Sequence, residues 1–281
     1  MKSLKYLILF VITVLLVSCK DSPVGLNKIT TPAENYTVAG SVTTGRYKAT
    51  VLFKDSDSLT TGYNVVYFKI QKDSVEQKNG YVKIFPKMWM SPTYTHSTPV
   101  SPTFEYDNST GYYKGHIIFN MPTDTTHEWK VIWWGFITYY EQNNLAATFD
   151  SLDLYTAYRR EREWIDIYDT TDQTSYYLTL IKPFSVVRGL NDFSVMLHKT
   201  DSRLNYFTQI FDAEMFIKTY LIDSNISSTG NISPVPDANG VYNGKINFPY
   251  AGRWNVVDSI KYQNRYITTY PSPPEFYFSA P

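Results

Sequence analysis

Hydrophobic and polar residues alternate along most of this chain in short runs. Residues 47–54 (YKATVLFK) and 116–121 (HIIFNM) show a period of two, which is typical of strands with one buried and one exposed face. Gly, Pro, Asn and Asp separate the runs, and these residues favour tight turns. No longer segment keeps the 3.6-residue period of an amphipathic helix. The pattern therefore predicts antiparallel strands, with Ile117 and Phe119 facing the core and His116 facing solvent.

The chain contains two diverged copies of one sequence pattern, one in each half. In both copies a strand-like run and a Gly-x-Asn triplet are followed by a Gly-x-Tyr-x-Gly motif and a run that ends in Phe. The corresponding segments are 50–54 with 179–182, 62–64 with 189–191, 111–115 with 240–244, and 116–119 with 245–248. The shared order and spacing indicate a duplication, in which we expect Trp129 and Trp254 to occupy equivalent buried positions.

Each copy has the size of an immunoglobulin-like domain, which packs about seven short strands into about 100 residues. We predict an all-β fold: two tandem immunoglobulin-like β-sandwich domains that follow a lipoprotein signal peptide. The dense charge run between the copies is interpreted as a solvated linker. The predicted boundaries are 1–18 for the signal peptide, 19–35 for a flexible tether, 36–155 for the first sandwich, 156–163 for the linker and 164–281 for the second sandwich.

The amino-acid composition argues against several classes of binding partner and of chemical site. Lys plus Arg and Asp plus Glu number 26 each, so the chain is formally neutral and lacks the basic excess with which proteins bind nucleic acid. Aromatic residues make up 17% of the chain, an enrichment that favours strands and argues against disorder. The single Cys excludes a disulfide within the chain and a Cys-based zinc cluster.

The first residues have the features of an export and anchoring signal. Lys2 and Lys5 precede an apolar run over residues 6–17, which is too short to span a bilayer but suits the hydrophobic region of a signal peptide. Residues 16–19 (LVSC) resemble the bacterial lipobox, in which the Cys thiol receives diacylglycerol and the Cys becomes the new N-terminus after cleavage. We therefore expect Cys19 to be lipidated and to bind membrane lipid through two or three acyl chains such as palmitate.

The residues after the lipobox indicate in which membrane the lipidated protein is anchored. Lys20 follows Cys19 directly, and Asp21 comes only at the next position. The simplest cue for retention in the inner membrane, an acidic residue directly after the Cys, is therefore absent. This favours the outer membrane, with the domains facing the periplasm or the cell surface, and leaves the inner membrane as the alternative.

The end of each copy resembles a known family of small extracytoplasmic domains. In the second copy Gly244 and Phe248 are followed by a short turn and Trp254, similar to the closing strands of YtkA-like (FixH-like) domains. The first copy is similar through Gly115 and Phe119, with a longer turn after them. The resemblance implies a β-sandwich fold and an extracytoplasmic compartment, and some members of the family are associated with copper or heavy-metal handling.

A methionine pair and a histidine in the first copy form a candidate soft-metal site. On a strand, Met88 and Met90 point to one side and Trp89 to the other. Neutral thioethers together with one imidazole, here His96 beyond a Ser-Pro turn, suit Cu(I) as a ligand set. We expect residues 219–221 to stand at these positions in the second copy, so the site would belong to the first domain only. The alternative is ordinary core methionine and a hydrogen-bonded loop histidine.

Tryptophans suggest a rival function, a binding module for a glycan or a peptide. Trp89, Trp133, Trp134 and Trp164 could form a stacking platform. Because Trp133 and Trp134 are neighbours on a predicted strand, their rings point to opposite faces and one of them should be exposed. We take Trp89 and Trp134 as the ligand-binding candidates. A purely structural or assembly role, with other envelope proteins as partners, remains the third possibility.

Motifs of catalysis are absent from the sequence. There is no Gly-x-Ser-x-Gly elbow, no His-Glu-x-x-His pair, no Gly-rich phosphate loop and no Cys nucleophile in the mature domains. We therefore expect no enzymatic activity and assign no catalytic residue. Two carboxylates from distant parts of the chain could still meet in space, and spacing along the sequence does not identify such a pair.

Overall fold

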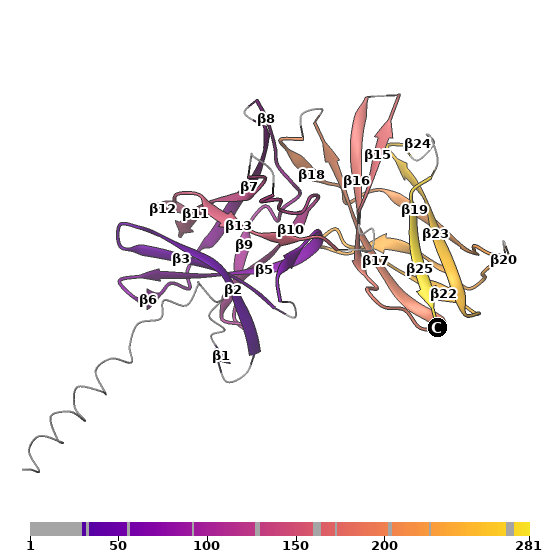
Figure 1. Ribbon diagram of the computed structural model, residues 1–281, viewed down its shortest axis with the longest axis horizontal. Coiled ribbons are helices and arrows are strands. Elements are labelled where there is room, and N and C mark those ends of the chain that lie inside the picture. Colours follow the sequence, from indigo (N-terminus) through magenta and orange to yellow (C-terminus); the bar gives the residue numbers. More distant parts are fainter. Residues whose placement is uncertain are drawn as a thin grey trace, which may run out of the picture.

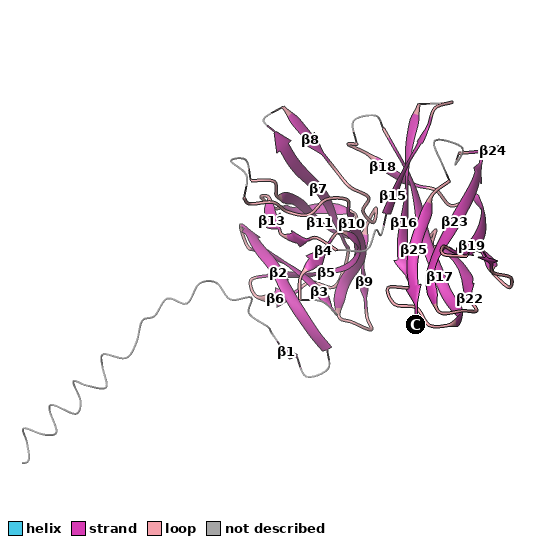
Figure 2. Ribbon diagram, turned by 45° about the vertical axis from the view of Figure 1, so that its right-hand side comes forward, coloured by secondary structure: helices cyan, strands magenta, loops and turns pink. Residues whose placement is uncertain are grey.

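The computed structural model describes residues 30–31, 34–54, 57–91, 93–126, 130–159, 164–171, 173–201, 204–224, 226–267 and 273–281. These residues form strands joined by turns, and none of them lies in a helix (Figure 2). The described part of the chain accordingly offers no helix that could cross a membrane. Figure 1 shows two β lobes, one from each half of the chain. This confirms the predicted fold class, two tandem immunoglobulin-like β-sandwiches.

The first sandwich is a single twelve-stranded sheet that closes over its own core. Its strand order is β1-β2-β3-β5-β10-β9-β7-β11-β12, with β6, β8 and β13 attached to β5, β7 and β11. The strands are β1 (Thr30–Thr31), β2 (Glu34–Thr44), β3 (Tyr47–Lys54), β5 (Gly62–Lys72), β6 (Val75–Glu76), β7 (Tyr81–Ser91), β8 (Tyr94–His96), β9 (Phe104–Asp107), β10 (Tyr112–Phe119), β11 (Trp133–Glu141), β12 (Asn144–Thr148) and β13 (Leu152–Leu154). Because β9 pairs with both β10 and β7, it joins the two layers of the sandwich.

The second sandwich has two separate sheets. Six strands form one in the order β15-β16-β17-β22-β21, with β18 on β17, and five form the other in the order β20-β19-β23-β24, with β25 on β23. The strands are β15 (Trp164–Asp169), β16 (Thr174–Lys182), β17 (Gly189–Thr200), β18 (Phe207–Gln209), β19 (Glu214–Leu221), β20 (Ile226–Ser227), β21 (Ile232–Pro236), β22 (Tyr242–Phe248), β23 (Gly252–Tyr262), β24 (Arg265–Tyr266) and β25 (Glu275–Ala280). The core lies between these two sheets.

The segment after the first sandwich is held against it before the second sandwich begins. A short parallel pair joins β14 (Thr156–Ala157) to β4 (Leu59–Thr60). Two further hydrogen bonds extend this contact, from the Thr61 amide to the Ala157 carbonyl at 3.0 Å and from the Arg159 amide to the Thr61 hydroxyl at 3.0 Å. The beginning of the segment predicted as a linker is therefore attached to the first sandwich.

A Gly-x-Asn motif builds the same turn in both copies. Gly62 and Gly189 have φ angles of 85° and 92°, a conformation that glycine adopts without steric cost. Asn64 and Asn191 follow two residues later and make matching hydrogen bonds to the backbone two and four residues before them. These turns start β5 and β17 in the same way, which is the local basis of the repeat.

The strand registers extend the repeat to the core tryptophans. Phe119 lies opposite Gly62 as Phe248 lies opposite Gly189. The next core ring is Trp133 in the first copy and Trp254 in the second, and each lies 5.4 Å from its Phe ring. Both indole N–H groups donate a 3.0 Å hydrogen bond to a backbone carbonyl.

The predicted equivalence of Trp129 with Trp254 therefore needs correction. Trp129 lies outside the described residues, whereas Trp133 occupies the position that matches Trp254 in strand pairing, burial and hydrogen bonding. The cause is the longer connection between β10 and β11. It places three tryptophans after the same motif, Trp129, Trp133 and Trp134, and only strand pairing shows which of them matches Trp254.

Two histidines lie buried where the sandwiches meet. His116 on β10 is covered from outside by the second sandwich and lines a cleft together with Met196. The prediction that His116 faces solvent was wrong, because a neighbouring domain covers the outer face of its strand. Burial lowers the pKa of His116 to about 4, and burial together with nearby His116 lowers the pKa of His198 to about 3. Both side chains are therefore neutral at physiological pH.

Candidate ligand-binding surface

The outer face of β7 and β11 carries a strip of aromatic side chains. Residues alternate along β7, so that Val82, Ile84 and Met88 point into the core and their neighbours point outward. β11 follows the same alternation beside it in antiparallel register. We name the outward aromatic residues the aromatic strip: Tyr81, Phe85 and Trp89 from β7, and Trp134, Phe136 and Tyr140 from β11.

The aromatic strip is organised in pairs of rings. Tyr81 and Tyr140 lie opposite each other with ring centroids 4.8 Å apart and planes 13° from parallel. Phe85 and Phe136 are also directly opposite, and both side chains are 40% exposed. Trp89 is 44% exposed, and its ring centroid lies 4.9 Å from that of Trp134. Three rungs of aromatic side chain thus follow one another along the two strands.

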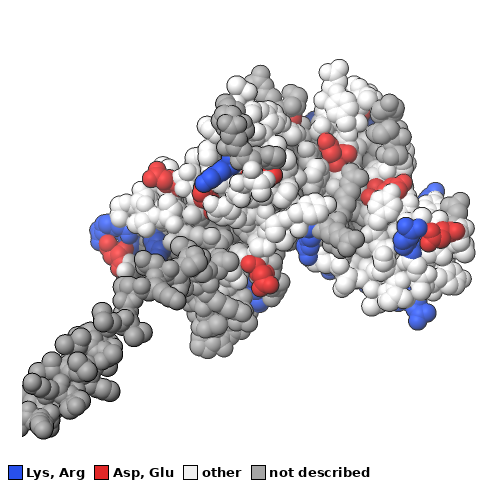
Figure 3. Space-filling view, in the orientation of Figure 1, with Lys and Arg blue, Asp and Glu red and all other residues white. Residues whose placement is uncertain are grey.

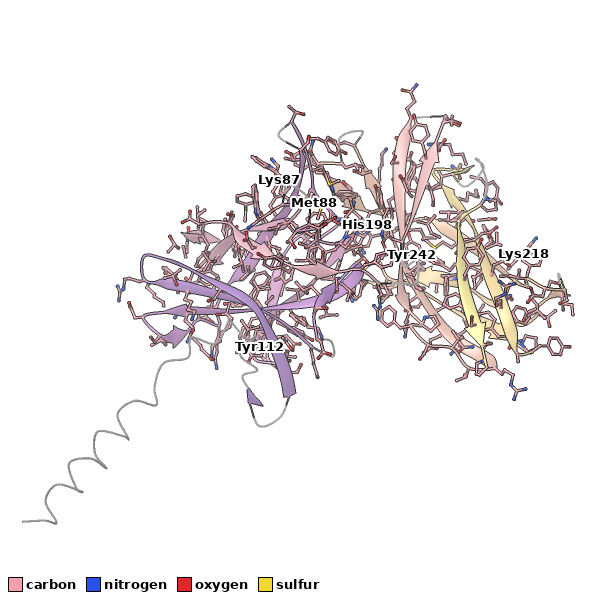
Figure 4. All side chains as sticks on the ribbon, in the orientation of Figure 1. Lys87, Met88, Tyr112, His198, Lys218 and Tyr242 are labelled. Atoms are coloured by element: carbon pink, nitrogen blue, oxygen red, sulfur yellow. The ribbon has the colours of Figure 1, made fainter. Side chains whose placement is uncertain are left out.

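Two lysines lie between the rungs. The ammonium of Lys83 stands 5.6 Å and 5.4 Å from the ring centroids of Tyr81 and Tyr140, a cation–π arrangement. Lys87 pairs with Trp134 across the strands, and Figure 4 labels it next to Met88. Among the described residues, neither ammonium forms an ion pair with a carboxylate. The strip is therefore a mixed aromatic and cationic surface.

Strand register identifies the equivalent face of the second sandwich. Leu221 on β19 lies opposite Trp254 on β23, just as Met88 on β7 lies opposite Trp133 on β11. Because the two tryptophans are equivalent, the outward positions of β19 and β23 correspond to those of β7 and β11 residue by residue. The repeat thus supplies an internal comparison for the aromatic strip.

In the second sandwich this face carries non-aromatic residues at the six positions of the strip, and its own rings, Phe216 and Tyr220, stand at the positions of Lys83 and Lys87. Glu214 and Lys261 stand where Tyr81 and Tyr140 stack, and they form an ion pair of 3.0 Å instead. The positions of Trp134, Phe136 and Thr138 are held by Asn255, Val257 and Ser259. The same backbone therefore forms without aromatic residues at these positions. Folding alone does not account for the aromatic strip.

The metal-ligand candidates lie on the opposite face of β7. Met88 pairs with His96 across the β7–β8 hairpin, and the two side chains are 0% and 2% exposed. Met90 is half-buried and packs against the same core. The structure thus brings Met88 and His96 together and puts Met90 on their side of the strand, while Trp89 faces outward.

His96 is held as a neutral imidazole with one free nitrogen lone pair. Its Nδ1 lies 2.9 Å from the Ser97 carbonyl oxygen, and since a carbonyl only accepts, Nδ1 carries the proton. Nε2 is buried and has no hydrogen-bond partner among the described residues. Burial lowers the pKa of His96, which favours the neutral form that metals require.

The second copy has no sulfur or imidazole donor at the matching positions. Leu221 pairs with Ile226 where Met88 pairs with His96. The expected correspondence of residues 219–221 with 88–90 was displaced by two positions, but the conclusion that the donor set belongs to the first copy is unchanged. Within the described ranges no group of three or more His, Cys, Asp or Glu side chains could hold a metal ion.

Sequence reasoning found only part of the strip. Of the four tryptophans expected in a platform, Trp89 and Trp134 meet, Trp133 is a core residue, and Trp164 stacks on Tyr177 in the second sandwich at 5.2 Å. The four Phe and Tyr members were missed. Their signal was an aromatic residue at every fourth position of 81–89 and again at 136 and 140, a spacing that places the members of each strand on one face of it. Cys19 lies outside the described residues.

Charge is sparse on much of the surface. On the face drawn in Figure 3, blue and red atoms lie in small groups of both signs, separated by white surface. The described residues in this view form no extended patch of one charge.

The matches of this chain to known proteins are found among solved structures. No family model matches it, and no curated protein matches it. Among solved structures it is similar to invasin, described as a bacterial integrin-binding protein, with 11% identity, a TM-score of 0.26, and coverage of 83% of this chain and 39% of that one. The Escherichia coli adhesin FdeC has 12% identity and a TM-score of 0.23 over 87% of this chain and 67% of its own. The D0–D1 domains of intimin have 12% identity and a TM-score of 0.23 over 80% and 95%.

Proposed function

We propose that this chain is an extracytoplasmic lipoprotein that acts as a non-catalytic binding module, with a glycan as the ligand of the aromatic strip. One observation supports the proposal above all others. Six aromatic residues occupy outward positions that the second copy of the same fold fills with Glu, Lys, Asn, Val and other residues. Exposed aromatic surface of this kind lowers solubility, so its presence at positions where the fold does not require it favours a binding role.

The position of the strip within the sheet favours a glycan over a peptide. Peptides commonly bind a sandwich by adding a strand to a sheet edge, where backbone groups are free. β7 is already paired with β8, β9 and β11, and β11 is paired with β7, β12 and β13. On the side of β7 away from β11, residues 83–87 have no strand partner. Pro86 within this stretch has no N–H, and its carbonyl already accepts a hydrogen bond from the Ser97 hydroxyl, so the strip offers mainly side chains. Sugar rings present a flat C–H face that stacks on aromatic rings, and this matches what the strip provides.

Exchanging strip residues for those of the second copy tests the glycan site. We expect the double variant Trp134→Asn, Phe136→Val to keep the melting temperature of the parent within a few degrees, because the second sandwich carries these residues at the same positions. Glycan affinity should fall at least about tenfold, the equivalent of about 1.4 kcal/mol. A glycan array followed by calorimetry on the retained glycans measures the change.

The matched control is Phe216→Ala, which removes an exposed ring from the equivalent face of the second sandwich. It should leave glycan affinity unchanged. Equal binding by the strip variant and the parent, or capture of peptides and not glycans by the same surface, would contradict the proposal.

The anchor is tested separately. Cys19→Ala should abolish incorporation of labelled palmitate and leave the signal peptide uncleaved, because only a thiol accepts the diacylglycerol. Mass spectrometry of the purified protein and fractionation of the cell envelope measure the two effects. A Cys19→Ala protein that still carries palmitate would exclude the lipobox interpretation.

A second candidate function is Cu(I) handling in the first sandwich. It is favoured by the pairing of Met88 with His96, by the free Nε2 of that imidazole and by Met90 on the same side of β7. Two thioethers and one neutral imidazole fit Cu(I) by donor type, and none of them carries a charge that would strengthen binding. The resemblance to YtkA-like domains supports the same chemistry. His96 would supply the nitrogen ligand through Nε2, with its ring oriented by the Ser97 carbonyl.

Metal titration tests this candidate. Calorimetry with Cu(I) under reducing conditions should show uptake by the parent protein and at least about a tenfold loss in the double variant Met88→Leu, Met90→Leu. Leucine nearly conserves the buried volume, so the fold should be retained. Met121→Leu, a half-buried methionine outside the set, is the control. Equal uptake by all three proteins, or uptake by none of them, would rule out the site.

A further inference from the structure

The aromatic strip is a long, narrow surface that could bind an extended chain along its length. Its rungs follow one another every four residues along β7, at Tyr81, Phe85 and Trp89. A strand rises about 3.4 Å per residue, so successive rungs are about 14 Å apart and the strip is about 27 Å long. A single sugar unit would contact one rung only. A ligand that contacts all three must therefore be a linear chain lying along the strands.

Charge on the strip is of one sign. The nine outward side chains of β7 and β11 are the six aromatic residues, Thr138 and the two lysines, and no carboxylate is among them. Lys83 lies between the first and second rungs, and Lys87 between the second and third. Carboxylates occur on the flanking strands, with Glu105 opposite Tyr81 on β9 and Asp153 opposite Trp134 on β13. An anionic chain would thus be attracted along the strip and repelled at its margins.

We propose that the ligand of the aromatic strip is a linear acidic polysaccharide that runs parallel to β7 and β11. Its sugar rings stack on the second and third rungs, and its carboxylate or sulfate groups pair with Lys83, which lies over the first rung, and with Lys87. The proposal rests on the proposed function, since it names the class of glycan bound by that surface. The cation–π contacts hold the Lys83 ammonium over the first rung before any ligand arrives, which reduces the entropy lost on binding.

Two other occupants fit the strip less well. A bilayer is contacted most deeply by protruding loops, whereas these residues lie on paired strands within a sheet. A second copy of the chain, related by a two-fold axis, would bring the lysines of one strip towards those of its partner. Both alternatives are distinguished by the experiment below.

The experiment uses the full-length protein in detergent micelles and three linear acidic polysaccharides, polygalacturonate, alginate and hyaluronate, each beside its methyl-esterified, neutral form. We expect at least one acidic polymer to bind. Esterification, or the double variant Lys83→Gln, Lys87→Gln, should weaken its binding at least about tenfold, and added salt should weaken it further. Lys218→Gln, on the equivalent face of the second sandwich, is the control and should bind like the parent (Lys218 is labelled in Figure 4). Oligosaccharides of two units should bind at least about tenfold less tightly than chains that span the strip.

The possible failures are distinguishable. Equal binding of the acidic and esterified polymers, with loss in the Trp134→Asn, Phe136→Val variant, would overturn the acidic class and keep the glycan function. Binding to none of the polymers in either form would overturn the acidic class, and if the glycan array also retains no glycan, the glycan function is overturned with it. Binding to lipid vesicles, or a dimer in analytical ultracentrifugation, that is lost with the strip variant would assign the surface to a membrane or to a second copy and overturn the proposal.

Discussion

Replacing Trp254 by alanine should lower the free energy of unfolding of the second sandwich by about 3–5 kcal/mol, in the range of large aromatic deletions in cores. The side chain is fully buried between the two sheets and packs on Phe248. Its indole N–H satisfies the Tyr250 carbonyl, which would lose a partner in the variant. A domain of this size has a total stability of only about 5–15 kcal/mol, so the loss is a large fraction of it.

Urea denaturation followed by circular dichroism measures this effect, with the two sandwiches fitted as separate transitions where the curve requires it. Trp254→Phe keeps most of the buried ring and should destabilise less than Trp254→Ala. The matched control is Trp89→Ala, since Trp89 is a half-exposed member of the aromatic strip and should cost less than about 1 kcal/mol. If the two alanine variants lose equal stability, the assignment of Trp254 to the core is wrong.

Replacing Asp258 by isoleucine should stabilise the second sandwich at pH 7 by about 2–4 kcal/mol, the size of the penalty for a buried polar group without a partner. Asp258 is fully buried on β23, and neither carboxyl oxygen has a hydrogen-bond partner among the described residues. Ile137 occupies the equivalent position in the first copy, because it lies opposite Ile84 as Asp258 lies opposite Ile217. Isoleucine is thus already accommodated at this place in the fold.

The same substitution should change how stability depends on pH. Burial raises the pKa of Asp258 well above its ordinary value, so the folded protein keeps the carboxyl protonated over a pH range in which the unfolded chain ionises. The unfolded state then binds fewer protons than the folded state, and stability falls as pH rises above about 4 towards the folded pKa. Asp258→Ile removes this loss, so its advantage over the parent should grow between pH 4 and pH 7.

His116 and His198 change the pH dependence of stability in the direction opposite to that of Asp258. Their pKa values of about 4 and about 3 are below that of an unfolded histidine, so stability is lost as pH falls below about 6.5. Both histidines are present in parent and variant, and their contribution cancels in the difference between the two proteins. Asp212→Ala, an exposed aspartate, is the control and should leave the curve unchanged. If the difference in free energy of unfolding between Asp258→Ile and the parent does not change with pH, Asp258 is not protonated in the folded protein.

Much of the fold was predictable because its causes are local. The period of two marks the strands, since one face of each strand is packed and the other is not. Gly62 and Gly189 start matching strands through a positive φ angle and an Asn two residues later, and these features are readable in the sequence as a repeated triplet. The equivalence of Trp133 and Trp254 was missed because a connection of different length precedes them, and connection length is not constrained by the core.

The sequence by itself determined the strand pattern, the duplication and the position of a soft donor set on one side of a hairpin, because each depends on residues close together in the chain. Only the tertiary structure decided that Tyr81, Phe85 and Trp89 lie beside the aromatic residues of β11, because non-local pairing brings the two strands together. It also decided that His116 is buried, since the covering surface belongs to the other sandwich. Alternation states which side chains share a face of a strand, but which strand or domain lies beside that face depends on how the whole chain packs.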